Sequence, residues 1–339
     1  MLVIYFLDIM NRIVWKTAES LTSHTQRSQK FAPLIRQVIT SELLNETENV
    51  IDVFDFDRLD SRISELLEVF PEPHITHALA VKAQPLTSVL AYVTRKFPQL
   101  GLECASIQEA LHAKRNTSAK TVVYDSPVKS REELTTAMQE GFYINLDNSD
   151  EMAEVQCLME EGLPPTDNCM FGVRLNPLVG AGSIITSSTA GVSSKFGLVY
   201  CEDTFPDILA LFQQYPWLCG VHCHIGSQGC SPQLLAEGAR TIFEAAEKIN
   251  AELGRQQVTV IDIGGGFPTS YVTDEDSQFI DYRNALDTFA PSLLLGKYRI
   301  ITEFGRSVFT KVGSTLVRVS NVKRSDPESK VHKCKLKPP

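Results

Sequence analysis

The 339-residue sequence predicts an α/β protein folded as a closed (β/α)8 barrel. From residue 75 onward, eight short apolar runs alternate with amphipathic stretches, and strands joined by crossover helices pair in parallel. Eight such units in about 230 residues match the size of one barrel. An open doubly wound sheet is the alternative that the same alternation allows.

The elements of the barrel follow one another in a regular order. Strands are expected where β-branched and aromatic residues cluster, at 76–82, 99–104, 121–125, 142–146, 169–175, 218–225, 258–264 and 298–303. Helices are expected where apolar residues recur near the 3.6-residue spacing, at 86–97, 106–115, 130–140, 150–161, 203–215, 232–253 and 278–290. Several of these segments open with Ser, Asp or Pro, which favour helix starts. Residues 50–59 predict one further strand ahead of the barrel, and residues 176–202 form a Gly/Ser/Thr-rich insertion expected to act as a binding loop or lid.

The chain is expected to divide into an N-terminal extension at 1–48, the barrel at 49–310 and a short C-terminal segment at 311–339. After the eighth predicted strand only 36 residues remain, which is too few for a second domain. Residues 322–339 carry six Lys/Arg against two Asp/Glu, so this tail is basic although the whole chain has a net charge of −9. The acidic body argues against a general nucleic-acid or membrane-binding surface.

Targeting and redox features favour a cytoplasmic protein. No run approaches the roughly 18 apolar residues of a membrane helix, and the apolar residues 1–10 lack the basic region and cleavage site of a signal peptide. Residues 10–36 are basic and rich in Ser and Thr, which leaves import into an organelle as an alternative. The eight cysteines form no CxxC pair and are expected to be reduced thiols.

Chemically capable residues stand at the carboxyl ends of the predicted strands, where a barrel carries its site. They are Lys82, Glu103, Cys104, Asp125, Asn145, Arg174, His224, Gly264, Gly265, Gly266, Glu303, Gly305 and Arg306. A lysine in this position either extends to solvent or is a desolvated amine whose lowered pKa makes it a nucleophile. A buried carboxylate such as Glu303 requires a cationic partner, either Arg306 or a protonated heterocycle.

Two further patterns suggest a phosphate and a planar ring. Glycines after the seventh predicted strand, next to Gly305 and Arg306 after the eighth, are typical of a phosphate site in a barrel. His224 is expected to stack on a planar cofactor, with the Ser227 hydroxyl reaching a phosphate, or else to be a hydrogen-bonded core histidine. His222 and His224 share one face of their strand near Cys219 and Cys230, but this spacing matches no usual zinc pattern, so no metal is expected.

An amine, a phosphate site, a stacking histidine and a carboxylate for a ring nitrogen together describe a barrel that holds pyridoxal 5'-phosphate. The sequence also resembles a family. Seven segments, AVKAQP, GLECAS, FGVRLNP, SSKFG, HIGSQ, DIGGGFP and EFGRS, resemble the successive motifs of the alanine-racemase-fold decarboxylases, which include the diaminopimelate and ornithine decarboxylases. The likeness runs from about residue 50 to 320, and the segments HIGSQ and VRLNP are closer to the diaminopimelate than to the ornithine enzymes.

The resemblance implies specific roles. Lys82 would form the internal aldimine, His224 would stack on the ring, and Glu303 would hold the pyridinium. Phosphate or substrate contacts would come from Ser227, Gly264, Gly265, Gly266, Gly305 and Arg306, and Glu103 and Arg174 would be charges near the cofactor. Glu303 would keep the ring an electron sink for a quinonoid carbanion, which favours loss of carbon dioxide from a basic amino acid over racemisation. Family members are homodimers, and the resemblance implies the same here.

The sequence departs from the family pattern in two places. Phe304 stands where the family has proline in EPGR, which keeps both charged neighbours. The C-terminal β-domain, which supplies a cysteine, an acidic residue and a tyrosine in the family, cannot be placed and is expected to be largely missing, and Cys334 lacks the matching context. The leading expectation is therefore a decarboxylase, and a catalytically impaired, antizyme-inhibitor-like relative that binds cofactor or a protein partner is the alternative. Glu303 disfavours a racemase, and the substrate stays open.

Overall fold

The computed structural model describes residues 32–45, 47–184, 188–271, 273 and 276–318, with the backbone of 321–324 and 332–335. The chain divides into two compact units. One holds residues 59–310, and the other joins the residues up to Arg58 with those from Lys311 onward. The segment 1–31, which contains most of the Ser/Thr-rich basic stretch, lies outside the described residues.

Eight parallel strands of the larger unit close into a barrel, which confirms the predicted fold class. In barrel order they are β2 (Ile75–Ala80), β3 (Gly101–Cys104), β4 (Val122–Tyr124), β5 (Tyr143–Leu146), β6 (Met170–Asn176), β8 (Leu218–His222), β9 (Val260–Asp262) and β10 (Arg299–Thr302). The β5–β6 and β10–β2 pairings complete the ring, so the open sheet is excluded. The short strand β7 (Leu198–Val199) adds to β6 from the inserted loop.

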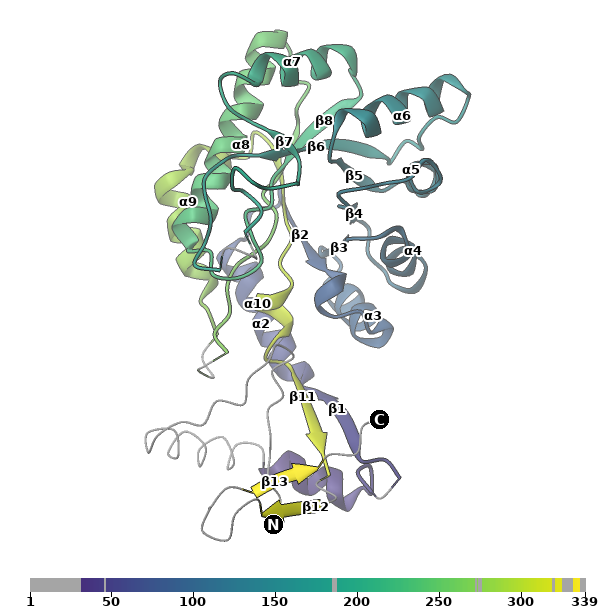
Figure 1. The fold of residues 1–339 in the computed structure, drawn as a ribbon, viewed down its shortest axis with the longest axis vertical. Coiled ribbons are helices and arrows are strands. Elements are labelled where there is room, and N and C mark those ends of the chain that lie inside the picture. Colours follow the sequence, from purple (N-terminus) through teal and green to yellow (C-terminus); the bar gives the residue numbers. More distant parts are fainter. Residues whose placement is uncertain are drawn as a thin grey trace. The chain divides into compact units, whose positions relative to one another are not determined.

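Helices follow the strands and lie outside them (Figure 1). They are α2 (Phe56–Val69), α3 (Thr87–Lys96), α4 (Ile107–Asn116), α5 (Arg131–Glu140), α6 (Ser149–Glu160), α7 (Phe205–Gln214), α8 (Pro232–Leu253), α9 (Phe279–Phe289) and the single turn α10 (Arg306–Phe309), with a 3₁₀ turn at Pro291–Leu295. The predicted start signals are confirmed, because the Ser106, Ser130 and Ser231 hydroxyls cap α4, α5 and α8. None of the helices in the described part of the chain combines the length and apolar character that a membrane span requires.

The barrel interior is packed around a tyrosine. Tyr143 on β5 lies in a buried cluster with Ala78, Val123 and Ile301, which come from three other strands. A Cβ at either Gly172 or Gly220 would overlap the Tyr143 hydroxyl, so strands β6 and β8 need glycine there.

Two strands end earlier than their sequences predict. After Ala80 the chain turns into the 3₁₀ segment η1 (Val81–Ala83), so Lys82 lies in a turn and not on the strand. Strand β8 ends at His222, and the carbonyl of Ile225 accepts from the Thr189 amide in the inserted loop. In both places the residues at the rim bond to distant parts of the chain, Lys82 to Glu103 on β3 and Ile225 to the inserted loop, and β-propensity alone does not reveal such partners.

The smaller unit contains the strand predicted ahead of the barrel. Strand β1 (Val50–Phe54) pairs antiparallel with β11 (Gly313–Val317), and residues 32–40 form a helix whose Ile35 and Val38 pack with Leu316. The residues expected as a tail include β12 (Asn321–Arg324) and β13 (His332–Lys335), which pair antiparallel.

Candidate active site at the carboxyl ends of the strands

Lys82 and Glu103 form an ion pair at the ends of neighbouring strands. The Lys82 Nζ lies 2.9 Å and 3.0 Å from the two carboxylate oxygens of Glu103, and the lysine is half exposed whereas the glutamate is fully buried. Burial disfavours the ammonium, but Glu103 and Glu303 outweigh this and raise the pKa of Lys82. Burial raises the pKa of Glu103 to about 8 against the opposing effect of Lys82. The amine is therefore protonated and sits beside an acceptor for its proton.

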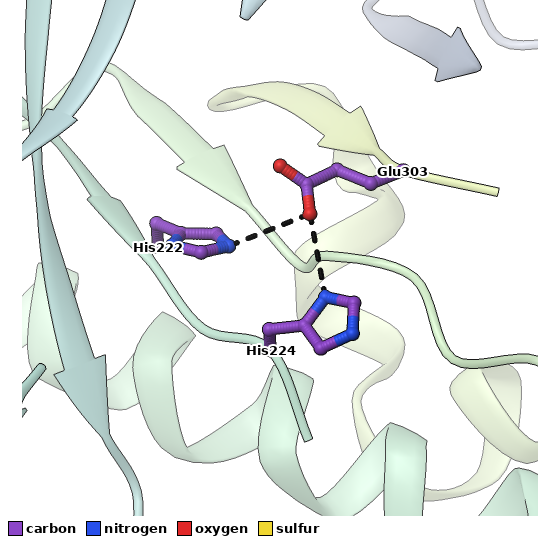
Figure 2. Close-up of side chains that lie close together, drawn as sticks. All are labelled: His222, His224 and Glu303. Carbon is purple, nitrogen blue, oxygen red and sulfur yellow. Dashed lines mark hydrogen bonds and ion pairs between the residues drawn. The ribbon is translucent and has the colours of Figure 1, made fainter. Parts of the chain in front are cut away.

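Glu303 lies between two histidines at the end of β10 (Figure 2). Its Oε2 is 3.6 Å from Nε2 of His222 and 3.4 Å from Nδ1 of His224. Burial disfavours the carboxylate, but His222 outweighs this and holds the pKa of Glu303 well below its usual range. The other oxygen, Oε1, is buried and has no hydrogen-bond partner among the described residues. It is an acceptor that a bound donor can use.

Nδ1 of His224 faces two groups, one of which requires it to be unprotonated and the other protonated. Its Nδ1 lies 3.3 Å from the Gly265 amide, which donates to it, and 3.4 Å from the Glu303 carboxylate, which can only accept. Burial lowers the pKa of His224 despite Glu303. The ring is therefore neutral, and its side chain keeps 16% of its surface exposed at the rim.

The three glycines after β9 are required by close backbone packing. A Cβ at Gly265 would overlap the carbonyl oxygen of Glu303, and one at Gly266, which has φ +91°, would overlap that of Gly226. The amides of Gly264 and Gly265 already donate to Asp262 and His224. The predicted phosphate role for these two amides thus competes with bonds inside the chain.

Arg306 begins α10 and reaches toward the loop after β8. Its Nη2 donates to the Ser227 hydroxyl at 3.2 Å, and its Nη1 donates to the Tyr271 hydroxyl. Its Nε is buried and has no hydrogen-bond partner among the described residues. Gly305 packs closely against Ala80 and Ala83, since a Cβ there would lie 2.8 Å and 2.9 Å from their Cβ atoms. The structure thus brings Ser227 and Arg306, which lie in separate motifs, within hydrogen-bond distance of each other.

Arg174 on β6 is committed to carboxylates of the barrel. Its Nη1 lies 3.3 Å from both oxygens of Asp125, its Nε is 3.9 Å from Asp147, and its guanidinium lies 4.6 Å from the centre of the Phe196 ring. Burial would raise the pKa of Asp125, but Arg174 and His222 outweigh it and lower this pKa. Among the described residues, Arg174 forms ion pairs with Asp125 and Asp147 and none with Glu303.

Four polar residues of the site received no role from the sequence. They are His222, Asp125, Asn145 and Asp262, and all four are buried at the strand ends. Asn145 donates to Asp262 at 3.0 Å, and burial followed by Glu303 raises the pKa of Asp262 well above its usual range, so Asp262 is neutral. The alternation in VHCHI places His222 on the same face of the strand as His224 and so indicates that it lies near the site, but the sequence suggests only a zinc ligand as its role.

The charged groups converge. Carboxylate oxygens of Glu103, Asp125 and Glu303 lie within 4.8 Å of one another, and so do ligand atoms of His222, His224 and Glu303. Each of these carboxyl groups already faces a basic group of the chain, Glu103 facing Lys82, Asp125 facing Arg174 and Glu303 facing His222. Neither cluster includes Cys219 or Cys230. We assign no metal to them. The seven cysteines whose side chains the structure describes are free thiols.

The inserted loop, residues 176–202, packs beside this site. Its Thr189 hydroxyl donates to the carbonyl of His224, and Ser188 forms a bridge with Gly226. The Asn176 amide in turn donates to the carbonyl of Gly191 at 3.0 Å. The loop thereby fixes the backbone that carries His224.

Known proteins are similar to this chain in sequence and in fold. The sequence model of the family described as "Pyridoxal-dependent decarboxylase, pyridoxal binding domain" matches residues 56–310. Diaminopimelate decarboxylase of Methanothermobacter thermautotrophicus is 28% identical over 57% of this chain and 45% of its own length. The Helicobacter pylori enzyme is 24% identical over 84% of this chain and 68% of its own length. The chain thus spans roughly half to two thirds of these relatives.

Solved structures show the same fold. The crystal structure of Helicobacter pylori diaminopimelate decarboxylase complexed with L-lysine has a TM-score of 0.71 at 23% identity and covers 84% of this chain and 70% of that one. The arginine decarboxylase of Paramecium bursaria Chlorella virus bound to agmatine has a TM-score of 0.67 at 19% identity, with 87% and 73% covered. The resemblance inferred from the seven motifs is confirmed. The chain belongs to the family of pyridoxal-dependent decarboxylases, and residues 56–310 correspond to their pyridoxal-binding domain.

Proposed function

We propose that this chain uses pyridoxal phosphate to decarboxylate a basic amino acid such as diaminopimelate. The observation that carries the proposal is the arrangement around Lys82. Its Nζ lies beside Glu103, and the oxygens of Glu103 and Glu303 lie within 4.8 Å of one another, so an amine and a buried ring-nitrogen acceptor face the same small volume. The diaminopimelate relatives support the substrate class.

The residues present fit pyridoxal phosphate, which is the cofactor of this family. Glu303 Oε1 is a buried carboxylate oxygen that still has room for a donor, as a protonated ring nitrogen requires. Arg306 Nε is a buried donor that still has room for an acceptor, as a phosphate requires. His224 keeps one partly exposed face at the rim. Lys82, Glu303, Arg306 and Ser227 would therefore hold the cofactor.

When bound, pyridoxal phosphate supplies an electron sink for the electrons left behind as carbon dioxide departs. Lys82 would anchor it through Nζ, which must first lose a proton because only a neutral amine attacks an aldehyde. Glu103 is placed to take that proton, since its oxygens are 2.9 Å and 3.0 Å away and its pKa is raised to about 8. This pair sets the pH at which the amine becomes reactive.

Glu303 would stabilise positive charge on the cofactor ring, since His222 holds it as a carboxylate. The guanidinium of Arg306 and the hydroxyl of Ser227 would bind the phosphate, because both groups point to one place. Gly266 lets the chain approach this region closely. Gly264 and Gly265 act mainly through the loop shape, since their amides are engaged.

The first experiment tests the cofactor attachment. Purified chain incubated with pyridoxal phosphate is expected to absorb near about 420 nm, and borohydride reduction should place the cofactor on the Lys82 peptide. Lys82→Ala should abolish both signals. Lys96→Ala is the matched control, because Lys96 is also half exposed and paired with a carboxylate, Asp60, and it should retain both. Retention of both signals by Lys82→Ala would refute the attachment.

The second experiment tests the reaction. Carbon dioxide release is measured with diaminopimelate, lysine, ornithine and arginine. Release from one of them supports the decarboxylase, and cofactor binding without release from any would favour the cofactor-binding relative that lacks catalysis. We further propose that the chain forms a homodimer, lies in the cytoplasm and divides into its three segments at residues 48 and 310. Light scattering tests the homodimer.

A further inference from the structure

His222 is a completely buried histidine with a carboxylate at each ring nitrogen. Its Nε2 lies 3.6 Å from Oε2 of Glu303, and its Nδ1 lies 3.8 Å from Oδ1 of Asp125. Both contacts are ion pairs and longer than a hydrogen bond, and neither ring nitrogen has a hydrogen-bond partner among the described residues. The ring therefore bridges the ends of β4 and β10 across the site.

The two carboxylates leave only one satisfactory protonation state for this ring. A neutral imidazole has one N–H donor and one lone pair, so one of its nitrogens would direct a lone pair at a carboxylate inside the protein. An imidazolium donates from both nitrogens and meets both carboxylates with opposite charge. The geometry thus favours the charged form whichever carboxylate is considered.

The other charged groups near the ring do not replace it. Arg174, which is paired with His222 in the β6–β8 register, gives its guanidinium to Asp125 and Asp147. His224 is neutral and accepts from the Gly265 amide.

Asp262, the register neighbour of His222 on β9, is itself neutral. Lys82 forms its ion pair with Glu103. Among the described residues, His222 is then the charged group in direct contact with Glu303. Although burial opposes it, the carboxylates of Asp125 and Glu303 raise the pKa of His222 to about 9.

We propose that His222 is a positioning residue that is charged at neutral pH, an imidazolium that bridges Asp125 and Glu303 and fixes the Glu303 carboxylate for its contact with the bound cofactor. The effect of the bridge on cofactor binding rests on the proposed function, whereas the bridge itself is a property of the chain without cofactor. Holding Oε2 directs the remaining oxygen, Oε1, toward a ligand. Without the bridge, Glu303 would lose both its orientation and its charge.

The test measures the charge of His222 directly. Full-length chain labelled with ¹⁵N-histidine is examined by long-range ¹H–¹⁵N correlation, with and without pyridoxal phosphate, as the pH is raised from about 6 to about 9. One histidine is expected to keep both ring nitrogens protonated at pH 8, and its signal should vanish in His222→Gln. His77→Gln is the matched control, because His77 is also a buried barrel histidine but burial lowers its pKa to about 4. It should leave the signal in place.

The outcomes separate this proposal from the proposed function. A neutral His222 at pH 7 in the unaltered chain overturns the bridge, whether or not the cofactor binds. Failure of the unaltered chain to bind pyridoxal phosphate overturns the proposed function and leaves the histidine spectrum as an independent result. If binding occurs, His222→Gln should weaken it about tenfold or more, with His77→Gln unchanged. Equal affinity in the His222 variant overturns the positioning role.

A second variant covers the case in which His222→Gln does not fold. Asp125→Asn keeps the shape of the side chain and removes one of the two facing charges. It should lower the pH at which the His222 signal titrates by at least about one pH unit. An unchanged titration overturns the bridge.

Discussion

Replacing His222 by glutamine is expected to change how the stability of the fold depends on pH. Glutamine keeps a side chain of similar size and one donor toward Glu303 or Asp125, but it carries no charge at any pH. The effect should therefore appear as a difference in slope between two curves of unfolding free energy against pH. A general packing defect would shift the two curves without changing their slopes.

The size and sign of the effect follow from the pKa of His222, which is about 9 in the fold against 6.5 for an ordinary histidine. A raised pKa stabilises the folded state fully below pH 6.5, and this contribution is lost as the pH rises toward 9. At 1.36 kcal/mol per pKa unit the contribution is roughly 3 kcal/mol. The unaltered chain should thus lose about 3 kcal/mol more than the variant between pH 6.5 and 9.

The assay is urea unfolding by linear extrapolation at several pH values. His77→Gln gives the opposite sign, since a pKa lowered to about 4 costs stability as the pH falls from 6.5 toward 4 and leaves the alkaline range unaffected. The change in slope should therefore lie above pH 6.5 for one variant and below it for the other. Parallel curves for His222→Gln and the unaltered chain between pH 6.5 and 9 would refute a charged His222.

Three other substitutions test neighbouring parts of the site. Gly266→Ala should destabilise the fold by about 2–5 kcal/mol in urea, because its φ is +91° and its Cβ would overlap the Gly226 carbonyl, and a neutral effect would contradict the packing. Glu103→Gln should lower the pKa of Lys82 and shift borohydride-trapped cofactor attachment to lower pH, whereas an upward shift would show that Glu103 does not hold the ammonium. Arg306→Ala should weaken binding of pyridoxal phosphate about tenfold or more but leave pyridoxal, which lacks the phosphate, unaffected. Equal losses for both ligands would exclude the phosphate contact.

The barrel could be predicted from the sequence because its signals are local. Each strand is a short run of β-branched residues. Helices such as α5 follow a serine, here Ser130, whose hydroxyl accepts a hydrogen bond from an amide in the first turn. Boundaries at the carboxyl ends were less accurate. Residues 223–225 have the apolar pattern of a strand, but a loop more than 30 residues away in the sequence binds Ile225, and no local pattern reports such a partner.

The site could be predicted only in part. Lys82, Glu103 and Glu303 could be proposed from the sequence because each is a charged residue at the end of an apolar run, and the structure brings their charged groups close together. The partner of Glu303 could not be predicted in this way. The sequence suggested Arg306 or a heterocycle, whereas the structure places His222 and His224 next to Glu303. Pairings across a barrel depend on how strands close in space, and alternation within one strand shows only which face a residue shares.

The paired charges at the strand ends explain why these partners matter. Lys82 pairs with Glu103, Arg174 pairs with Asp125, and His222 faces both Asp125 and Glu303. Removal of a buried partner leaves a charge without its counterpart, which costs about 3–5 kcal/mol. Of the carboxyl groups of Glu103, Asp125 and Glu303, only that of Glu303 keeps an oxygen without a hydrogen-bond partner. A ligand that brings a positive ring nitrogen to that oxygen therefore adds a bond without displacing one, which is why the chain can hold its own charges in place and still receive the cofactor.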